Sequence, residues 1–371
     1  MLKLSQPNIS EKAIAAVADV LRSGQLVHGA ESDAFEKELA IYLGCGDVVL
    51  VSSGTAALHI ALLALDIGPG DAVIVPDFTF PATANVVAMT GARPVILDVD
   101  QDTYTIDVTL LEQTVRNWSG PERLRAVMPV HEFGCVADMV EINRIAKEHT
   151  LLVIEDAACA LGASLNGCMA GTIGDLGCFS FHPRKTLTTG EGGAISTNDP
   201  IMAARLRRLR NHGMERTETG MRFFEPATNY RLTNFQAALG RAQLPMLDSW
   251  IAQRRQLASV YLKLLAPLQA RCLLRLPDYT DGHSWQTFML VNTSEQPRAE
   301  IIQALREAGV EANLGAQSLC ALGIYGGSEQ ASPCGGNLYR EGIALPFCEQ
   351  YSEVMLEKVA KALTEYFADL S

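Results

Sequence analysis

Between about residues 48 and 200, short apolar runs alternate with longer segments that repeat apolar residues at helical spacing. The runs are continuously apolar, which is typical of strands covered on both faces, since half-exposed strands alternate polar and apolar positions. They predict seven strands, at residues 48–51, 72–75, 94–97, 126–130, 151–154, 178–181 and 194–196. We therefore expect an α/β fold with a mostly parallel seven-stranded sheet flanked by helices.

The first segment predicts a separate helix. Ser10 is the expected N-cap, and Gly24 is the expected stop signal. Ile14, Val17 and Leu21 recur at helical spacing and so lie on one face of this helix.

Beyond residue 230 the pattern changes to longer helices and fewer strands, with strand patterns at 288–292 and 309–313. The other predicted helices of the chain lie at residues 55–65, 139–149, 232–244, 250–265, 298–307 and 351–367. The helix at 250–265 is long enough to link two lobes. We predict a large domain of residues 1–245, which includes the N-terminal segment, and a smaller C-terminal α+β domain of residues 246–371.

Lys185 has the most specific chemical signal in the chain. It lies between the apolar run that ends at Phe181 and the glycine-rich turn at residues 190–193. A lysine placed there is suited to form a Schiff base, whereas most lysines are solvated surface amines. Asp156 ends another apolar run, and a strand-end acid can pair with a protonated pyridine nitrogen. An amine and an acid in this order are what pyridoxal 5′-phosphate (PLP) chemistry needs.

Some of these assignments have alternatives. The Asp156 carboxylate could cap a helix over residues 157–160. Glu155 could replace Asp156, although strand alternation aims Glu155 at the other face. His182 and Arg184 either contact substrate phosphates or are structural. Lys185 must be neutral part of the time to react, so we expect burial and the cationic ring to lower its pKa.

A phosphate site is predicted where the strand at 48–51 passes into the next helix. Gly54 lets the backbone approach closely, and the first amides of the helix, at Gly54, Thr55 and Ala56, point toward an anion. Just past the strand at 72–75, an aromatic side chain could stack on a pyridine ring. Phe80 is our choice for that role; ordinary core packing is the alternative for Phe78 and Phe80.

Composition limits the classes of function. The 371 residues are 48% hydrophobic and 19% charged, with a net charge of −12, which argues against nucleic-acid binding. No apolar run approaches the ~20 residues that span a bilayer, and the start shows no secretory signal. The nine cysteines are odd in number and scattered, which predicts free thiols and no metal site. We expect a cytoplasmic protein.

Taken together, these motifs resemble the DegT/DnrJ family of sugar-nucleotide aminotransferases, which have the type I fold of PLP enzymes. The matching segments, which run over essentially the whole chain, are Ser23-Gly24, Ser53-Gly54-Thr55-Ala56-Ala57-Leu58, Thr79-Phe80-Pro81-Ala82-Thr83-Ala84-Asn85, Glu155-Asp156-Ala157-Ala158, Phe179-Ser180-Phe181, Lys185, Gly190-Glu191-Gly192-Gly193, Arg210-Asn211-His212-Gly213 and Asn229-Tyr230-Arg231-Leu232-Thr233.

The resemblance implies that Lys185 forms the imine and that Asp156 meets the ring nitrogen. It implies that Phe80 stacks on the ring, and that Gly54, Thr55 and Ser180 bind the cofactor phosphate. The asparagine that matches Asn229 reaches the phosphate of the neighbouring subunit in the family. We therefore expect an obligate homodimer with shared active sites.

Two positions depart from the family pattern. Cys159 stands beside the cofactor ring where the family usually has glutamine or histidine, and a thiol cannot supply the same hydrogen bonds. Cys348 also replaces a more usual polar residue. A minority of relatives have histidine at the lysine position and catalyse dehydration, so Lys185 favours transamination.

The resemblance implies transfer of an amino group from L-glutamate to a keto-sugar linked to a nucleoside diphosphate. A dTDP- or GDP-linked 4-keto-6-deoxyhexose, aminated at C4, is the expected acceptor. Its product would enter a surface polysaccharide, such as the O-antigen of lipopolysaccharide, or a deoxyaminosugar metabolite. Amination at C3, amination of a cyclitol and a catalytically inactive regulatory protein are the alternatives.

Overall fold

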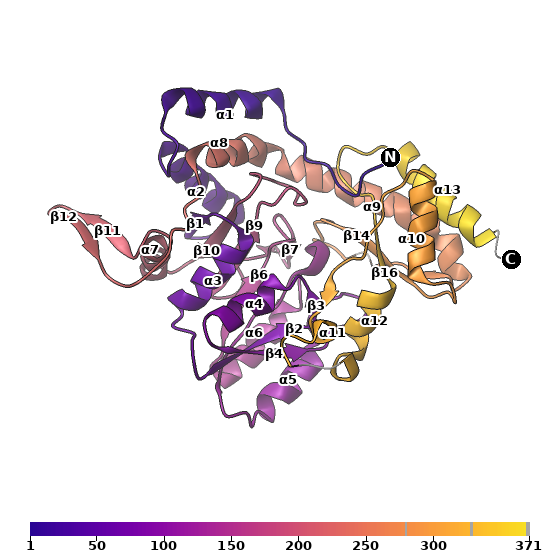
Figure 1. The fold of residues 1–371 in the computed structure, drawn as a ribbon, viewed down its shortest axis with the longest axis horizontal. Coiled ribbons are helices and arrows are strands. Elements are labelled where there is room, and N and C mark those ends of the chain that lie inside the picture. The colour runs from indigo at the N-terminus through magenta and orange to yellow at the C-terminus, as the bar shows by residue number, and fades with distance from the viewer. Residues whose placement is uncertain (279, 327–328, 369–371) are drawn as a thin grey trace.

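The computed structural model describes residues 1–278, 280–326 and 329–368. Its centre is a seven-stranded sheet in the order β1-β10-β9-β6-β5-β2-β4 (Figure 1). The strands are β1 (Asp47–Val51), β2 (Asp71–Pro76), β4 (Arg93–Leu97), β5 (Arg123–Val127), β6 (Leu152–Asp156), β9 (Leu176–Ser180) and β10 (Gly193–Thr197). β10 is antiparallel to both of its neighbours, and the other pairs are parallel. The predicted mostly parallel seven-stranded sheet is confirmed.

Helices cover both faces of this sheet, which explains why its strands are apolar throughout. Along β2, Val73 packs into the core beneath α3 (Gly54–Ala64), α4 (Ala82–Met89) and α7 (Pro200–Leu209). The next residue, Ile74, points to the opposite face and packs with α5 (Val108–Arg116) and α6 (Met139–His149). The alternation follows from the two-residue repeat of a strand.

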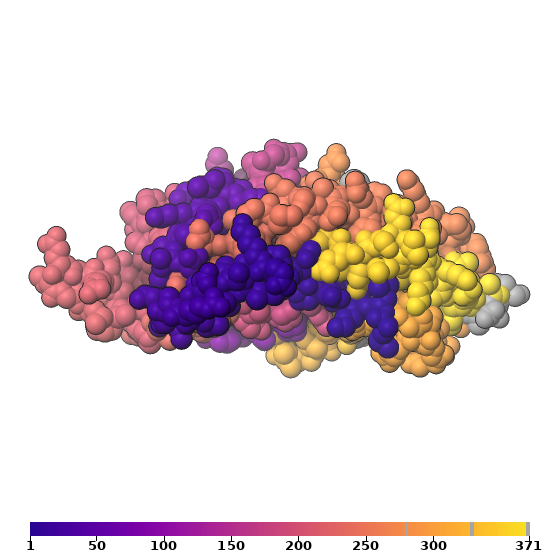
Figure 2. Space-filling view, turned by 90° about the horizontal axis from the view of Figure 1, so that it is seen from above, coloured from indigo at the N-terminus to yellow at the C-terminus, as the bar shows by residue number. Residues whose placement is uncertain are grey.

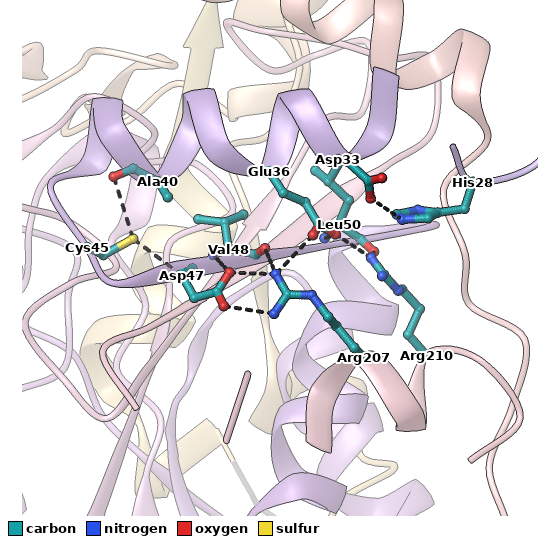
Figure 3. Close-up of polar contacts among 10 residues, drawn as sticks. All are labelled: His28, Asp33, Glu36, Ala40, Cys45, Asp47, Val48, Leu50, Arg207 and Arg210. Carbon is teal, nitrogen blue, oxygen red and sulfur yellow. Dashed lines mark hydrogen bonds and ion pairs between the residues drawn. The ribbon is translucent and has the colours of Figure 1, made fainter. Parts of the chain in front are cut away.

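A buried group of charged side chains fixes the edge strand β1 (Figure 3). Glu36 of α2 (Ala30–Leu43) accepts hydrogen bonds from Arg207, Arg210 and the Leu50 amide. Arg207 also makes two hydrogen bonds to Asp47, at 2.6 and 2.7 Å. The Glu36–Arg210 pair is buried, and removing one partner of a buried ion pair is strongly destabilising. α2, α7 and β1 are thereby locked together, and β1 leads directly into the predicted phosphate site.

The N-terminal helix α1 (Glu11–Ser23) begins and ends as predicted. Ser10 caps it by accepting from the Ala13 amide, and Gly24 ends it in the left-handed conformation, with φ 72°. The helix lies across α8 (Asn234–Gln243) (Figure 1). Its predicted apolar face is largely exposed, since about half of the surface of Ile14 and of Leu21 is accessible.

A hairpin of β11 (Met214–Thr217) and β12 (Gly220–Phe223) projects from one end of the molecule (Figure 2). Met221 and Phe223 of this hairpin are among the most exposed large apolar side chains. Large apolar side chains are unusual on a projecting element whose surface contacts only solvent.

A second core lies in the C-terminal part. It is built on the antiparallel sheet β13 (Leu274–Arg275), β14 (Phe288–Asn292) and β16 (Gly342–Leu345), with helices α9 (Leu247–Ala270), α10 (Arg298–Glu307) and α13 (Glu353–Ala368). α9 carries the chain from the large sheet into this core (Figure 1). Among the described helices, none is both long and apolar enough to cross a membrane.

The predicted strand at residues 309–313 is wrong. Val310 and Asn313 each make an isolated bridge, to Leu2 and Ala344 respectively. The segment changes partner after three residues, so no continuous ladder forms. Residues 2–4 therefore pack on the C-terminal core, although the prediction assigned them to the large domain. The domain boundary at residue 246 stays a prediction.

Two buried carboxylates attach the C-terminal part to the large sheet. Asp77, directly after β2, accepts from the Cys320 amide of α11 (Leu319–Leu322) at 2.7 Å. Asp98, directly after β4, accepts from Ser332 and from the Gly335 amide at the start of α12 (Pro333–Glu341). β15 (Gln317–Ser318) also pairs with β3 (Phe78–Thr79). These contacts bring the C-terminal part against one edge of the predicted site.

Candidate active site

The candidate residues lie where parallel strands end. Gly54 follows β1, Phe80 follows β2 and β3, Asp156 ends β6, and Ser180 ends β9. Open α/β sheets bind ligands outside the carboxyl ends of their strands. The fold thus brings together residues that are up to about 130 positions apart in the chain.

Lys185 lies in a tight turn after β9. Its amide donates to the His182 carbonyl at 2.8 Å, and the Arg184 amide donates to the His182 ring at 3.2 Å. His182 therefore has a structural role in forming this turn. The Lys185 ammonium points to Cys159, with 2.9 Å between Nζ and Sγ. The structure therefore brings the predicted amine against the position that departs from the family pattern.

The surroundings of Lys185 act on its pKa in opposite directions. Burial lowers the pKa, but Cys159 and Asp156 act in the opposite direction, and the net result is a pKa above the usual value. The sequence argument expected a lowered pKa. That argument included the positive charge of a cofactor ring, whereas the protein groups around the amine are acids.

Asp156 is almost fully buried at the end of β6. One carboxylate oxygen accepts from the Thr83 hydroxyl at 2.9 Å, and the other accepts from the Ala158 amide at 3.2 Å. Burial raises the pKa of this carboxyl, and the two hydrogen bonds partly offset that rise. No helix forms over residues 157–160, so the alternative of a helix N-cap is wrong. A buried carboxylate with unused lone pairs suits a cationic N–H partner.

Glu155 points to the opposite face of β6, as strand alternation predicts. It accepts from the His131 ring at 2.8 Å and from three backbone amides, those of Gly171, Ile173 and Gly174, at 2.6 to 2.7 Å. Its lone pairs are occupied by the protein itself. Glu155 is therefore structural, which leaves Asp156 as the acid of the site.

The start of α3 forms an anion cradle. The Ser53 side chain caps the helix by accepting a hydrogen bond from the Ala56 amide at 3.0 Å, and the Ser53 carbonyl accepts one from the Ala57 amide. In the described part of the chain, the amides of Gly54 and Thr55 have no acceptor and remain available for a ligand. Gly54 also touches Ser180, because a Cβ on Gly54 would lie 2.8 Å from the Ser180 Cβ.

The two phenylalanines near β3 have different environments. Phe78 is fully buried and packs edge-on against Tyr104 and Phe133. Phe80 is 71% exposed, one turn before Thr83, whose hydroxyl contacts both the Phe80 carbonyl and Asp156. Phe78 is thus a core residue, and Phe80 is the ring that a ligand can reach.

Two residues from the sequence analysis lie apart from this group. Asn229 is exposed, forms a bridge with Asn211 and accepts from the Arg231 amide at 3.4 Å. Within the described residues, Asn229 makes no hydrogen bond with Lys185. Cys348 is buried beside the C-terminal core and the start of the chain.

Three residues near Lys185 escaped the sequence analysis. Thr83 was only part of a motif, although its hydroxyl bonds Asp156. Gln286 lines the Lys185 cavity and donates to the Arg184 carbonyl at 2.8 Å. Glu132 begins the short helix η1 (Glu132–Gly134) after β5 and is buried, with its pKa raised to about 8 by burial. An acid directly after an apolar run was the available signal for Glu132, as it was for Asp156.

The arrangement fits the parts of PLP. A reactive amine, a buried acid, an anion cradle and an accessible aromatic ring converge at one end of the sheet. The enclosed cavity beside Lys185 is small, about 10 Å³, and Phe80 faces outward. In a single chain the Phe80 ring is therefore accessible to solvent.

The family model of the DegT/DnrJ/EryC1/StrS aminotransferase family matches residues 7–364. The chain belongs to this family. A related protein of Caulobacter vibrioides (strain ATCC 19089 / CIP 103742 / CB 15), named GDP-perosamine synthase, is 42% identical over 281 residues, which are 75% of this chain and 74% of that protein. The DegT-family membership makes this chain a sugar aminotransferase.

Solved structures share the fold over nearly the full length. The aminotransferase TlmJ from Streptoalloteichus hindustanus is 30% identical with a TM-score of 0.92, covering 100% of both chains. DesV from S. venezuelae, in complex with a ketimine intermediate, is 36% identical with a TM-score of 0.87, covering 95% of this chain and 94% of that chain. Spr1654 from Streptococcus pneumoniae, in a PLP form, is 27% identical with a TM-score of 0.90, covering 99% and 98%. These DegT-family likenesses are consistent with fold type I.

Proposed function

We propose that this enzyme uses PLP to transfer the amino group of L-glutamate to a keto-sugar linked to a nucleoside diphosphate. The observation that carries the proposal is the convergence of Lys185 and Asp156 at the carboxyl end of the sheet, next to the α3 cradle. The PLP form of Spr1654 and the ketimine complex of DesV support the cofactor.

PLP, when bound, supplies an electron-withdrawing ring that stabilises negative charge on the substrate carbon. Asp156 would keep the ring nitrogen protonated, because its buried carboxylate needs a cationic partner. Gly54, Thr55 and Ser180 would hold the phosphate, and Phe80 would stack on the ring. Lys185 would anchor the cofactor, and its neutral amine would then move a proton between the substrate and the cofactor.

The acceptor is proposed to be a 4-keto-6-deoxyhexose aminated at C4. The name of the Caulobacter relative, GDP-perosamine synthase, supports a GDP-linked sugar ahead of a dTDP-linked one. The product would serve surface polysaccharide or deoxyaminosugar synthesis. Assaying the purified enzyme against GDP- and dTDP-linked 4-keto sugars, a 3-keto sugar and a keto-inositol tests the carbon and the nucleotide together.

The active form is proposed to be a homodimer with shared sites. The exposed apolar side chains of Phe80, Ile14, Leu21 and Phe223 support an interface. A cavity of about 630 Å³ is lined by Arg208, Arg216 and Arg231, among other residues. Asn229 makes an isolated bridge with Asn211, which also lines this cavity, and the cations of the cavity suit the phosphate of the partner's cofactor. Sedimentation of the enzyme should give a dimer mass.

Borohydride reduction followed by peptide mapping tests the central assignment. The cofactor should be found attached to Lys185 after reduction. Lys185→Ala should abolish glutamate-dependent release of 2-oxoglutarate, whereas the control Lys147→Ala, on the surface helix α6, should not change it. A label on another residue, or turnover at the wild-type rate in Lys185→Ala, contradicts the proposal.

A further inference from the structure

Glu132 has a buried carboxyl group that takes no part in the roles proposed for the other active-site residues. It follows β5 and is only 4% exposed. The preceding His131 turns its ring to Glu155, on the far face of the sheet. The charges of Lys185 and Asp156 both act on the Glu132 carboxyl, so this carboxyl lies on the side of the sheet that holds these two residues.

The groups that face Glu132 are Lys185, Asp156 and Cys159. Burial raises the pKa of Glu132 to about 8, while Lys185 lowers it and Asp156 raises it by smaller amounts. At neutral pH the carboxyl therefore keeps its proton. A carboxylic acid held neutral by burial is a hydrogen-bond donor, which an ionised carboxylate is not.

Glu132 and Cys159 share one corner of the pocket. A Cβ placed on Gly134, in the same turn as Glu132, would lie 3.3 Å from the Cys159 carbonyl oxygen. The Cys159 thiol already accepts from Lys185, and a thiol is a weak donor. This corner therefore contains one strong neutral donor, the O–H group of Glu132.

We propose that Glu132 is a cofactor-binding acid whose O–H group donates a hydrogen bond to the ring oxygen of PLP. The inference rests on the proposed function, because it requires PLP to bind at Lys185. That oxygen is next to the ring carbon whose aldehyde group Lys185 attacks, so it belongs on the Lys185 side of the ring. A donor there stabilises its negative charge, and no covalent bond forms or breaks.

Three variants separate this role from simple packing. Glu132→Gln keeps an N–H donor but cannot titrate, and Glu132→Leu keeps the approximate volume but removes the donor. Glu132→Leu combined with Cys159→Gln places a new amide donor in the same corner. The two measurements are the Kd of PLP for the cofactor-free protein and the pH dependence of the absorbance spectrum of the bound cofactor.

The imine of bound PLP has its own pH-dependent spectral transition, and a hydrogen bond donated to the ring oxygen shifts the midpoint of that transition. Glu132→Gln, which keeps a donor, should keep the midpoint near that of the wild type and its Kd within about threefold, whereas Glu132→Leu should shift the midpoint. Glu132→Leu should bind PLP about tenfold more weakly, the size of one lost hydrogen bond, and the double variant should regain most of that loss. Glu141→Gln, on the exposed face of α6, is the matched control and should behave as wild type.

A loss of PLP affinity of about tenfold or more in Glu132→Gln, which keeps a donor, overturns the inference even if the leucine variants do not fold. An unchanged Kd in Glu132→Leu, or a double variant as weak as Glu132→Leu, also overturns it. Borohydride labelling distinguishes this failure from failure of the proposed function. If Lys185 is labelled in every variant, PLP binding stands and only the role of Glu132 is wrong.

Discussion

The ammonium of Lys185 donates to the thiol of Cys159 across 2.9 Å. This contact joins the turn after β9 to the turn after β6, two segments that end neighbouring parallel strands. Among the protein groups that raise the pKa of Lys185, the thiol has the largest effect. Cys159 therefore influences when the amine is neutral, although it cannot replace the amide or imidazole that the family usually has there.

Cys159→Ala should lower the pKa of Lys185, because it removes a hydrogen bond that favours the ammonium. The rate of PLP attachment to cofactor-free protein should then reach half its maximum at a lower pH than in the wild type. Cys168→Ala, at an exposed cysteine, is the control. An unshifted midpoint in Cys159→Ala would mean that the thiol has no effect on the amine.

Gly54→Ala should weaken PLP binding by about tenfold or more, since its Cβ would lie 2.8 Å from the Ser180 Cβ and force the two sides of the phosphate cradle apart. Isothermal titration of the cofactor-free protein measures the change. Gly68→Ala is the matched control, because its nearest contact is an ordinary 3.6 Å. Equal losses in both variants would assign the effect to glycine replacement in general.

Glu155→Ala should destabilise the fold by about 3–5 kcal/mol, because it leaves the buried His131 ring, one buried amide and two part-buried amides without their acceptor. Urea unfolding with a constant m-value measures the loss. Glu141→Ala, at a half-exposed position on α6, should stay within about 0.5 kcal/mol of the wild type. A loss that small in Glu155→Ala would contradict the structural role of Glu155.

Glu132 should make stability depend on pH. Its pKa is raised in the folded state, so its stabilising contribution is complete below the unfolded value of 4.5 and is lost as pH rises to about 8. Glu132→Gln should remove this dependence, making the variant more stable relative to wild type at pH 8 than at pH 5, by on the order of 4 kcal/mol. Urea midpoints at the two pH values measure the difference. Parallel curves for the two proteins would rule out the shift.

Arg254 and Glu349 form a buried ion pair at 2.8 Å, and Arg254 also donates to the carbonyls of Trp285 and Gln286. Arg254→Met should cost about 3–5 kcal/mol, because it leaves the buried Glu349 side chain without its ionic partner. Arg254→Met combined with Glu349→Leu should recover a large part of that loss in urea unfolding. If the stability lost in the double variant equals the sum of the losses in the two single variants, Arg254 and Glu349 are not energetically coupled.

The sheet was predictable because a strand that is buried on both faces must be apolar at every position. Such strands can be recognised in the sequence as runs of apolar residues, as in β2 and β6. The strand predicted at 309–313 failed because a short apolar run does not reveal its partners, which here are Leu2 on one side and Ala344 on the other. Lys185 and Asp156 were found because each follows an apolar run and matches a family motif. Glu132 also follows one but matches no motif, and its burial depends on neighbours tens of residues away.

The amino-acid sequence by itself determined the seven strands, the family and the order of the amine, the acid and the phosphate-binding turn, because these depend on local pattern and residue type. Only the tertiary structure showed that the Glu155 carboxylate accepts hydrogen bonds from His131 and three amides. It also decided that Phe78 lies in the core while Phe80 is accessible. Finally, it brought Glu132 and Cys159 together at Lys185. The physical reason is that burial and charge interactions act through space. They are set by which strand ends lie side by side, and no local pattern records that arrangement.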